Sequence, residues 1–194
     1  MVHVTAASNV PLIMEHGLMP AATLAELAGV TPDRLAMRHV RRKIAPPFGM
    51  CVLNHQKPIL DAGDAPERTL DGYTGLEWAA QLDQRVFFAP AKQLDDFKAS
   101  VAKDLPIAEI TVSTEGLLEA CGDEIELAPI NTGNFRQGGA HAARGDWIYV
   151  PATAGLPAFR KNRAARGLVK TPDSVKEISM RGTVPPNVLN AIAV

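Results

Sequence analysis

Residues Ser174–Pro186, SVKEISMRGTVPP, contain the pattern that decides the fold. Ile178 and Met180 alternate there with Glu177 and Ser179, and this period of two is typical of a strand with one apolar and one polar face. The glycine and the paired prolines that follow end the strand. The carboxylate of Glu177 belongs to the polar face. It is therefore either solvated at the edge of a sheet or part of the lining of a cleft.

A second strand of the same kind opens the chain at Val2–Thr5. Its two valines point to one side, and His3 and Thr5 point to the other. If this strand and the one that carries Glu177 border one cleft, an imidazole, a hydroxyl and a carboxylate meet there. A histidine near an N-terminus is more often exposed or hydrogen-bonded to the backbone than it is a ligand.

Composition limits what the protein can be. The chain has 194 residues, 46% of them hydrophobic, and a formal charge of −1, which predicts one domain, residues 1–194, with a substantial core. No apolar run approaches the roughly 18–20 residues that cross a bilayer, and no basic-then-apolar leader follows Met1, so we expect a cytoplasmic protein without a membrane partner. Cys51 and Cys121 lack metal-site spacing and are expected to be buried thiols, with no metal bound.

A cluster of arginines is predicted on one helix. Thr31-Pro32-Asp33 is typical of a helix start, and the three- and four-residue spacing of Arg34, Arg38, Arg41 and Arg42 places them on one face, with Lys43 extending the charge. Such a face attracts phosphates. The same cations also interact favourably with a helix C-terminus, without any further function. The near-neutral net charge disfavours a strongly basic nucleic-acid module but leaves room for a local patch.

The segment Gln84–Pro90, QRVFFAP, is the most apolar short strand and is expected at the centre of a sheet. Arg85, at its start, either pairs with an acidic neighbour or holds an anionic ligand. A long segment from Pro129 to Gly145 lacks apolar periodicity and includes His141 and Arg144. It is either a substrate-facing loop or a series of turns closed by its own Asn and Thr side chains.

The remaining elements alternate irregularly. Further helices are expected at 10–17, 21–28, 74–82, 94–101, 114–120 and 156–166, and further strands at 48–53, 107–112, 124–127 and 146–150. Within these helices, Thr74 and Glu77 have the spacing of a capping box, and the spacing of Leu27 and Phe97 predicts that both face inward. Regular strand–crossover–strand units and a glycine-rich phosphate loop are both missing from this pattern, which disfavours a doubly wound nucleotide fold. We expect an α+β domain built around two small sheets.

Three segments carry a resemblance to a known group of enzymes. HVTAASNVPLIMEHGL at the start, RVFFAP in the middle and VKEISMRGTVPP near the end resemble, in order and spacing, the DarT-type ADP-ribosyltransferases that modify thymidine in single-stranded DNA. The chain resembles more closely an uncharacterised bacterial family of the same ADP-ribosyltransferase-like group, through NHQKPIL, PINTGN and RGDWIYVP. This resemblance covers nearly the whole chain.

The resemblance implies a fold, a co-substrate and a site. It implies split, mixed β-sheets with flanking helices, NAD as co-substrate and no metal. Glu177 is implied as the catalytic carboxylate, with Arg85 beside it as a phosphate or ribose contact. The residues implied to bind NAD are His3, Thr5, Asn9, Phe87 and Phe88. The residues implied to contact a DNA or RNA acceptor are Arg38, Arg41, Arg42 and Arg144.

The resemblance leaves the acceptor open. After RVFFAP the chain continues AKQLDDF, where DarT enzymes have Arg-Ser-Pro, and their DNA-contacting loops do not align with this sequence. Three functions therefore remain: an ADP-ribosyltransferase acting on a macromolecule, an NAD glycohydrolase or related phosphate-transfer enzyme, and a catalytically silent nucleotide- or nucleic-acid-binding domain. The first would fit a bacterial toxin with an antitoxin or immunity partner.

Overall fold

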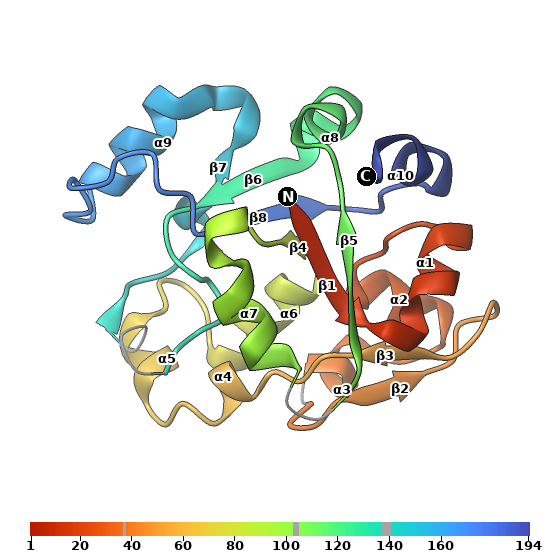
Figure 1. Ribbon diagram of the computed structural model, residues 1–194. Coiled ribbons are helices and arrows are strands. Elements are labelled where there is room, and N and C mark those ends of the chain that lie inside the picture. The colour runs from red at the N-terminus through yellow and green to blue at the C-terminus, as the bar shows by residue number, and fades with distance from the viewer. Residues whose placement is uncertain (37, 103–104, 137–140) are drawn as a thin grey trace.

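The computed structural model describes residues 1–36, 38–102, 105–136 and 141–194. Within them, short helices surround small antiparallel sheets (Figure 1), so the expected α+β class is confirmed. The described strands form three sheets, where the sequence predicted two. The α-helices are α1 (Val10–His16), α2 (Ala21–Leu27), α3 (Pro32–Ala36), α4 (Lys57–Leu60), α5 (Ala65–Thr69), α6 (Gly75–Asp83), α7 (Leu94–Val101), α8 (Thr114–Cys121), α9 (Gly155–Ala164) and α10 (Pro186–Ile192).

The largest sheet has the strand order β4–β8–β6–β7. These strands are β4 (Arg85–Phe88), β8 (Glu177–Arg181), β6 (Ile125–Ala128) and β7 (Val150–Pro151). The alternation predicted for β8 is confirmed, because Met180 pairs with Val86 and Ile125 in a buried apolar layer, whereas Glu177 belongs to the opposite face. Since β8 has a neighbour on each side, Glu177 does not lie on a solvated edge strand.

A two-stranded sheet of β1 (Val2–Ala6) and β5 (Ile107–Thr111) stands beside the large one. A single bridge between Val2 and Ala89 joins β1 to the end of β4 (Figure 1). The central position predicted for β4 is therefore wrong, because this strand lies at the edge of the four-stranded sheet. Its apolar sequence reflects burial on the inner layer, where Phe88 is 2% exposed.

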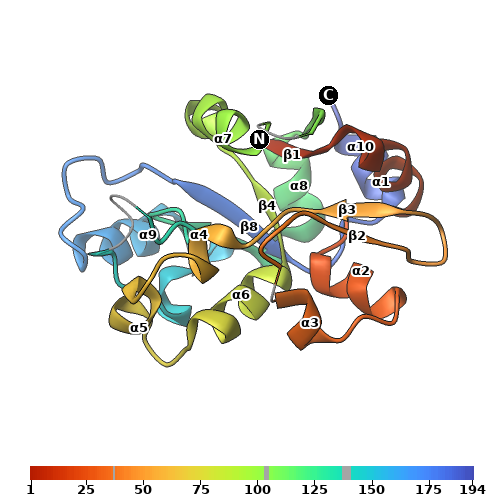
Figure 2. The ribbon, with the colours of Figure 1, turned by 90° about the horizontal axis from the view of Figure 1, so that it is seen from below.

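The third sheet is a hairpin of β2 (Arg42–Ile44) and β3 (Cys51–Leu53), next to α2 and α3 (Figure 2). The helix predicted from Thr31 through Lys43 is thus wrong from Arg38 onward. Pairing with β3 gives residues 42–44 backbone hydrogen bonds and buries Ile44, and this tertiary stabilisation outweighs the helical spacing of the arginines.

Arg38 departs most from the expected surface face. Its guanidinium group is buried against Asp83 at the end of α6, with Nη1–Oδ2 and Nη2–Oδ1 distances of 2.7 and 2.5 Å. Two further donors reach the carbonyl oxygens of Leu35 and Asn54, at 2.8 and 2.6 Å. This pair joins the N-terminal helices to α6 and is not available to phosphates in solvent.

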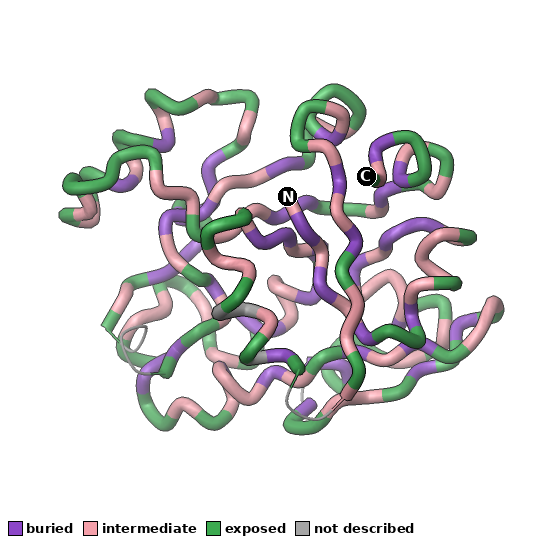
Figure 3. The backbone as a smooth tube through the Cα atoms, viewed as in Figure 1, coloured by how far each residue is buried: buried purple, intermediate pink, exposed green. Residues whose placement is uncertain are grey.

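Two apolar cores lie on the two sides of the four-stranded sheet. One fills the space between its apolar face, the β1–β5 sheet and helices α8 and α10. The other surrounds Trp78 of α6, which is fully buried with Ala128, Phe135, Ile148 and Tyr149. Figure 3 shows buried positions concentrated in the inner strands and exposed positions along the outer turns of the helices. The second core forms the floor beneath Glu177.

Local sequence patterns in α6, α2, α7 and residues 146–150 led to predictions with different outcomes. The capping box of Thr74 and Glu77 is confirmed by reciprocal hydrogen bonds at the start of α6. Leu27 was expected to face inward but is 45% exposed. The strand predicted at 146–150 is wrong at its start, because residues 146–148 form a 3₁₀ turn that buries Ile148. Phe97, expected on the apolar side of α7, lies outside the residues whose side chains are described.

The buried Arg38–Asp83 pair yields a stability prediction. Asp83→Asn leaves the guanidinium charge buried without its counter-ion, and we expect the free energy of unfolding to fall by about 3–5 kcal/mol. The control is Asp173→Asn, which breaks the exposed Arg160–Asp173 pair and should change little. Urea denaturation followed by circular dichroism measures both. Equal stability of the two variants would contradict the structural role given to Arg38.

Candidate functional site

Glu177 is part of a chain of side-chain hydrogen bonds on the polar face of β8. The hydroxyl of Thr132 donates a short hydrogen bond to Oε1 of Glu177. The hydroxyl of Tyr149 donates to Oγ1 of Thr132 at 3.1 Å, and Nε1 of Trp78 donates to the backbone oxygen of Thr132 at 3.0 Å. Thr132 is fully buried, so its hydroxyl has a fixed direction. The Tyr149–Thr132–Glu177 order aims one donor at the carboxylate.

The surroundings of Glu177 change its acidity. Burial raises the pKa of the Glu177 carboxyl to about 7, although the Thr132 hydrogen bonds and the charges of Arg144 and Arg85 act in the opposite direction. The residue as a whole is half-buried. A carboxyl with this pKa can both accept and release a proton near neutral pH, as a general acid–base group requires.

Arg85 is buried behind the same face. Its Nε donates to Oε2 of Glu126 at 2.8 Å, its Nη1 donates to the backbone oxygen of Gln81 at 2.7 Å, and its guanidinium carbon lies 4.0 Å from the ring centre of Tyr149. Of the two roles that the sequence allowed, pairing with an acidic neighbour is the one observed. Nη2 of Arg85 has no hydrogen-bond partner among the described residues.

Glu126 extends the network along the sheet. Besides Arg85, it accepts hydrogen bonds from Arg181 at 3.1 Å and from Ser179 at 3.4 Å. The Glu126 side chain is 13% exposed, so these three residues meet a carboxylate that is largely buried.

Tyr149 remains protonated. The burial of Tyr149 and the nearby charge of Glu177 raise the pKa of its phenol, so the hydroxyl stays a hydrogen-bond donor.

The sequence did not single out Glu126, Thr132 and Tyr149. The sequence pattern could have identified Glu126 as a residue on the polar face of a strand. It alternates with Ile125 and Leu127 in an expected strand, as Glu177 alternates with its neighbours in β8. No sequence pattern marks Thr132 or Tyr149, since a threonine in a turn and a tyrosine in an apolar run are both common. Only the folded chain brings them within hydrogen-bonding distance.

Arg144 is a structural arginine in the loop that carries Thr132. It is 1% exposed, and it donates to the backbone oxygens of Ala142, Asn134 and Asn131 at 2.5, 2.6 and 3.2 Å. Its guanidinium group also lies 4.1 Å from the ring centre of Phe135, and burial lowers its pKa to about 10. The expectation that it contacts nucleic acid does not agree with this burial. Residues 137–140 of the predicted substrate-facing loop lie outside the described chain.

His3 belongs to a different cluster. Nδ1 lies 2.9 Å from the backbone oxygen of Phe87, and the imidazole packs edge-on against Phe88 with ring centres 6.0 Å apart. Burial lowers the His3 pKa, so the ring is neutral at neutral pH and Nδ1 carries the donated proton. Phe88 is too deeply buried to stack on a nicotinamide, which corrects its expected role, whereas Phe87 is half-buried.

Strand β4 separates His3 from Glu177. Phe88 pairs with Ile178, next to Glu177, while Ala89 pairs with Val2, next to His3. The backbones of the two residues are thus about two strand spacings apart, roughly 10 Å. Their hydrogen-bond partners differ, and the Phe88 ring that His3 contacts is on the apolar side of the sheet, away from Glu177. The structure therefore does not join them in one hydrogen-bonded cluster.

Thr5 and Asn9 form a clamp between two sheets. Nδ2 of Asn9 donates to Oγ1 of Thr5 at 3.0 Å and to the backbone oxygen of Val52 at 2.9 Å. The backbone N–H of Val52 in turn donates to Oδ1 of Asn9 at 2.9 Å. The polar groups expected to hold NAD thus fasten β1 to β3, and Asn9 is buried.

The remaining arginines of the predicted basic face do not share one helix. Arg42 donates to the backbone oxygen of Arg34 at 2.7 Å, and Nη2 of Arg41 makes a short hydrogen bond to the backbone oxygen of Val101. With Arg38 buried, the expected four-arginine nucleic-acid surface does not form. Arg41 and Arg42 stay half-exposed.

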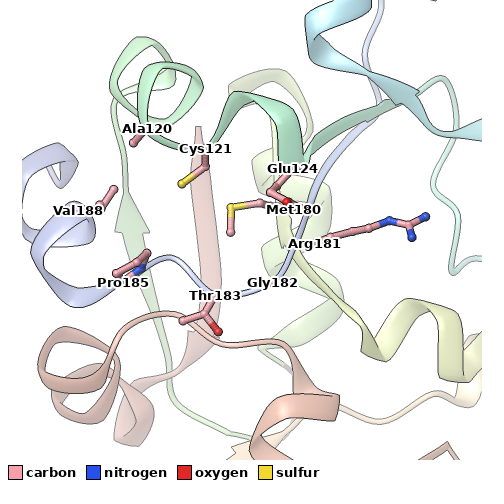
Figure 4. A pocket seen from close by; sticks show the side chains of 9 residues that line it. All are labelled: Ala120, Cys121, Glu124, Met180, Arg181, Gly182, Thr183, Pro185 and Val188. Carbon is pink, nitrogen blue, oxygen red and sulfur yellow. The ribbon is translucent and has the colours of Figure 1, made fainter.

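A hollow lies at the far end of β8 (Figure 4). This cavity of about 350 Å³ is lined by Cys121, Met180, Thr183 and Val188, while the Arg181 side chain extends away from Cys121. Burial and the charge of Glu124 raise the pKa of the Cys121 thiol, which makes it a poor nucleophile. Both cysteines are free thiols.

The described residues lack two further features. They contain no group of three His, Cys, Asp or Glu side chains arranged to hold a metal ion. None of their helices has the length and apolar character needed to cross a membrane.

Comparison with known proteins places the chain in a family. It belongs to the Family of unknown function (DUF7002), whose profile matches residues 1–191. The match includes both terminal strands and Glu177. Neither the curated proteins nor the solved structures gave a match.

The raised pKa of Glu177 predicts a pH dependence of stability. The folded protein binds this proton more tightly than the unfolded chain, where the pKa is near 4.5, so the contribution is present below about pH 4.5 and is lost as the pH rises through about 7. The substitution Glu177→Gln removes the ionisable carboxyl, so the variant does not lose this stability as the pH rises. Relative to wild type, the variant should therefore gain about 2–3 kcal/mol between about pH 4.5 and about pH 8.

Chemical denaturation at a series of pH values measures the difference. Glu119→Gln, an exposed glutamate on α8, is the matched control and should follow the wild-type curve. Parallel curves for wild type and Glu177→Gln would show that Glu177 ionises as it does in water.

Proposed function

We propose that this chain is an NAD-dependent ADP-ribosyltransferase in which Glu177 is the catalytic carboxylate. The observation that carries the proposal is the half-buried Glu177 at the start of an interior strand, held by Thr132 and given a pKa of about 7 by burial. The separation of β1–β5 from the four-stranded sheet, with one bridge between them, suits the split sheets of an ADP-ribosyltransferase-like fold.

The chemistry follows from the properties of one carboxylate. When the bond between nicotinamide and ribose breaks, nicotinamide leaves as a neutral molecule and the ribose C1′ becomes an oxocarbenium-like cation. The ionised form of Glu177 stabilises this cation electrostatically. As the acceptor attacks C1′, its proton passes to Glu177, whose pKa near neutrality suits both steps. The acceptor then carries ADP-ribose, and the protonated carboxyl of Glu177 loses its proton to water, which restores the carboxylate.

Thr132 and Tyr149 act through Glu177. The donated hydrogen bond of Thr132 stabilises the carboxylate form and fixes the direction of its oxygens, and Tyr149 orients the threonine hydroxyl. The indole of Trp78 holds the backbone of Thr132 from below. Thr132 is therefore a positioning residue, and its loss should alter how activity depends on pH.

The decisive assay uses NAD labelled in its adenylate part. Purified protein is incubated with the labelled NAD in three parallel reactions, which contain single-stranded DNA, RNA or no added acceptor. We expect label on a macromolecule with wild type and with the exposed control Glu119→Gln, and at least a hundredfold less with Glu177→Gln, since acid–base groups contribute about 10²–10⁴-fold.

The assay also separates the alternatives. Release of free ADP-ribose without labelled acceptor would indicate an NAD glycohydrolase, and absence of any turnover would indicate a silent binding domain. Full activity of Glu177→Gln would refute the role given to this residue.

A pH profile tests the positioning role of Thr132. With wild type, NAD turnover should rise with pH through about 7 as Glu177 ionises. Thr132→Val removes a hydrogen bond to the carboxylate and should move this rise upward by about 1–2 pH units. Thr132→Ser keeps the hydroxyl and should restore the wild-type midpoint. An unchanged midpoint in Thr132→Val would mean that the hydrogen bond does not tune Glu177.

A further inference from the structure

A cavity of about 430 Å³ lies at the junction of the two smaller sheets, away from the Glu177 network. Its walls come from the turn after β1, from the β2–β3 hairpin and from the segment that enters β5. The lining residues are Ala7, Ser8, Arg41, Lys43, Val52, Leu105 and Pro106. None of these residues belongs to the Glu177 network. The size falls within the range of about 300–1,000 Å³ that is typical of small-molecule sites.

Side chains alternate between the two faces of the β2–β3 hairpin, and this alternation places the charged residue Lys43 at the cavity. Lys43 and Val52 are directly opposite each other in the β2–β3 register, so their side chains share one face. Their neighbours Ile44, Cys51 and Leu53 are buried in the core beneath. Lys43 thus lies beside Val52 on the outer face of the hairpin, and Lys43 is exposed.

The cavity wall is held rigidly. Asn9 exchanges two hydrogen bonds with the backbone of Val52, and the N–H of Ala7 donates to the backbone oxygen of Pro106 at 2.9 Å. The guanidinium group of Arg41 is anchored to the backbone oxygen of Val101. These contacts fix the backbone of the cavity wall and the guanidinium group of Arg41 without requiring a ligand. Preformed sites of this kind bind without a large ordering cost.

The chemistry of the lining defines the class of ligand. The described lining contains two cations, one hydroxyl from Ser8 and no carboxylate, above a floor of aliphatic side chains and proline. Guanidinium and ammonium groups bind phosphate oxygens, and the hydroxyl can donate a further hydrogen bond. The aliphatic floor suits an apolar or flat group attached to that anion.

We propose that the cavity between Ser8, Arg41, Lys43 and Val52 is a binding site for a small organic phosphate, such as a nucleoside monophosphate. This site does not depend on the chain being a transferase, because it shares no residue with the Glu177 network. Its ligand would join the β1–β5 sheet to the hairpin and stabilise their junction.

Titration of the ¹⁵N-labelled protein with AMP, followed by NMR, tests the proposal. We expect saturable shifts of the amides of Ala7, Ser8, Lys43 and Val52 at millimolar AMP, and weaker binding at high salt. Adenosine, which lacks the anion, should cause no saturable shifts, and inorganic phosphate should bind more weakly than AMP because it gains nothing from the apolar floor.

Two lysine variants provide the matched comparison. Lys43→Gln should weaken AMP binding about fivefold, while Lys92→Gln, which removes another exposed lysine outside the cavity, should leave it unchanged. Both positions are exposed, so neither change should disturb folding. The proposal is overturned if AMP shifts none of these amides, if both variants bind as wild type does, or if inorganic phosphate binds as tightly as AMP, which would indicate an adventitious ion only.

Discussion

The hydrogen bond between Thr132 and Glu177 depends on one constraint, the position of β8 between β4 and β6. Backbone pairing on both edges fixes where each residue of β8 lies and which face it presents. The apolar side chains enter one core, so the alternate residues must face the loop that carries Thr132. That loop rests on Trp78 and Tyr149 in the second core. A polar network of this kind gains strength from its low-dielectric surroundings because each member has a partner.

Buried arginines hold the loops around this sheet. Arg38 joins the N-terminal helices to α6 through Asp83. Arg144 donates hydrogen bonds to backbone oxygens of the loop after β6. Arg163 of α9 donates to the backbone oxygens of Pro129 and Ser174. A guanidinium group suits this task because it offers five donors in one plane. Loops held this way need few apolar side chains, which agrees with an aromatic content of 5%.

Sequence patterns predicted best where neighbouring residues supply the energy. The capping box at Thr74 and the alternation around Met180 depend on residues a few positions apart, and both appear as expected. The arginine face failed because helical spacing near Arg42 competes with pairing to Leu53, a contact that local spacing does not reveal. The edge position of β4 was missed for a similar reason, since burial by helices and burial by strands leave the same apolar pattern.

The sequence by itself determined the α+β class, most strands and helices, and the place of Glu177 on the polar face of a strand with alternating apolar and polar residues. Only the tertiary structure decided that Thr132 and Tyr149 meet this carboxylate, that Arg85 pairs with Glu126, and that His3 lies across β4 from it. The physical reason is that propensity and periodicity act within a few residues. Hydrogen bonds between distant segments, and the pKa shifts they bring, arise only when the closed chain excludes water around them.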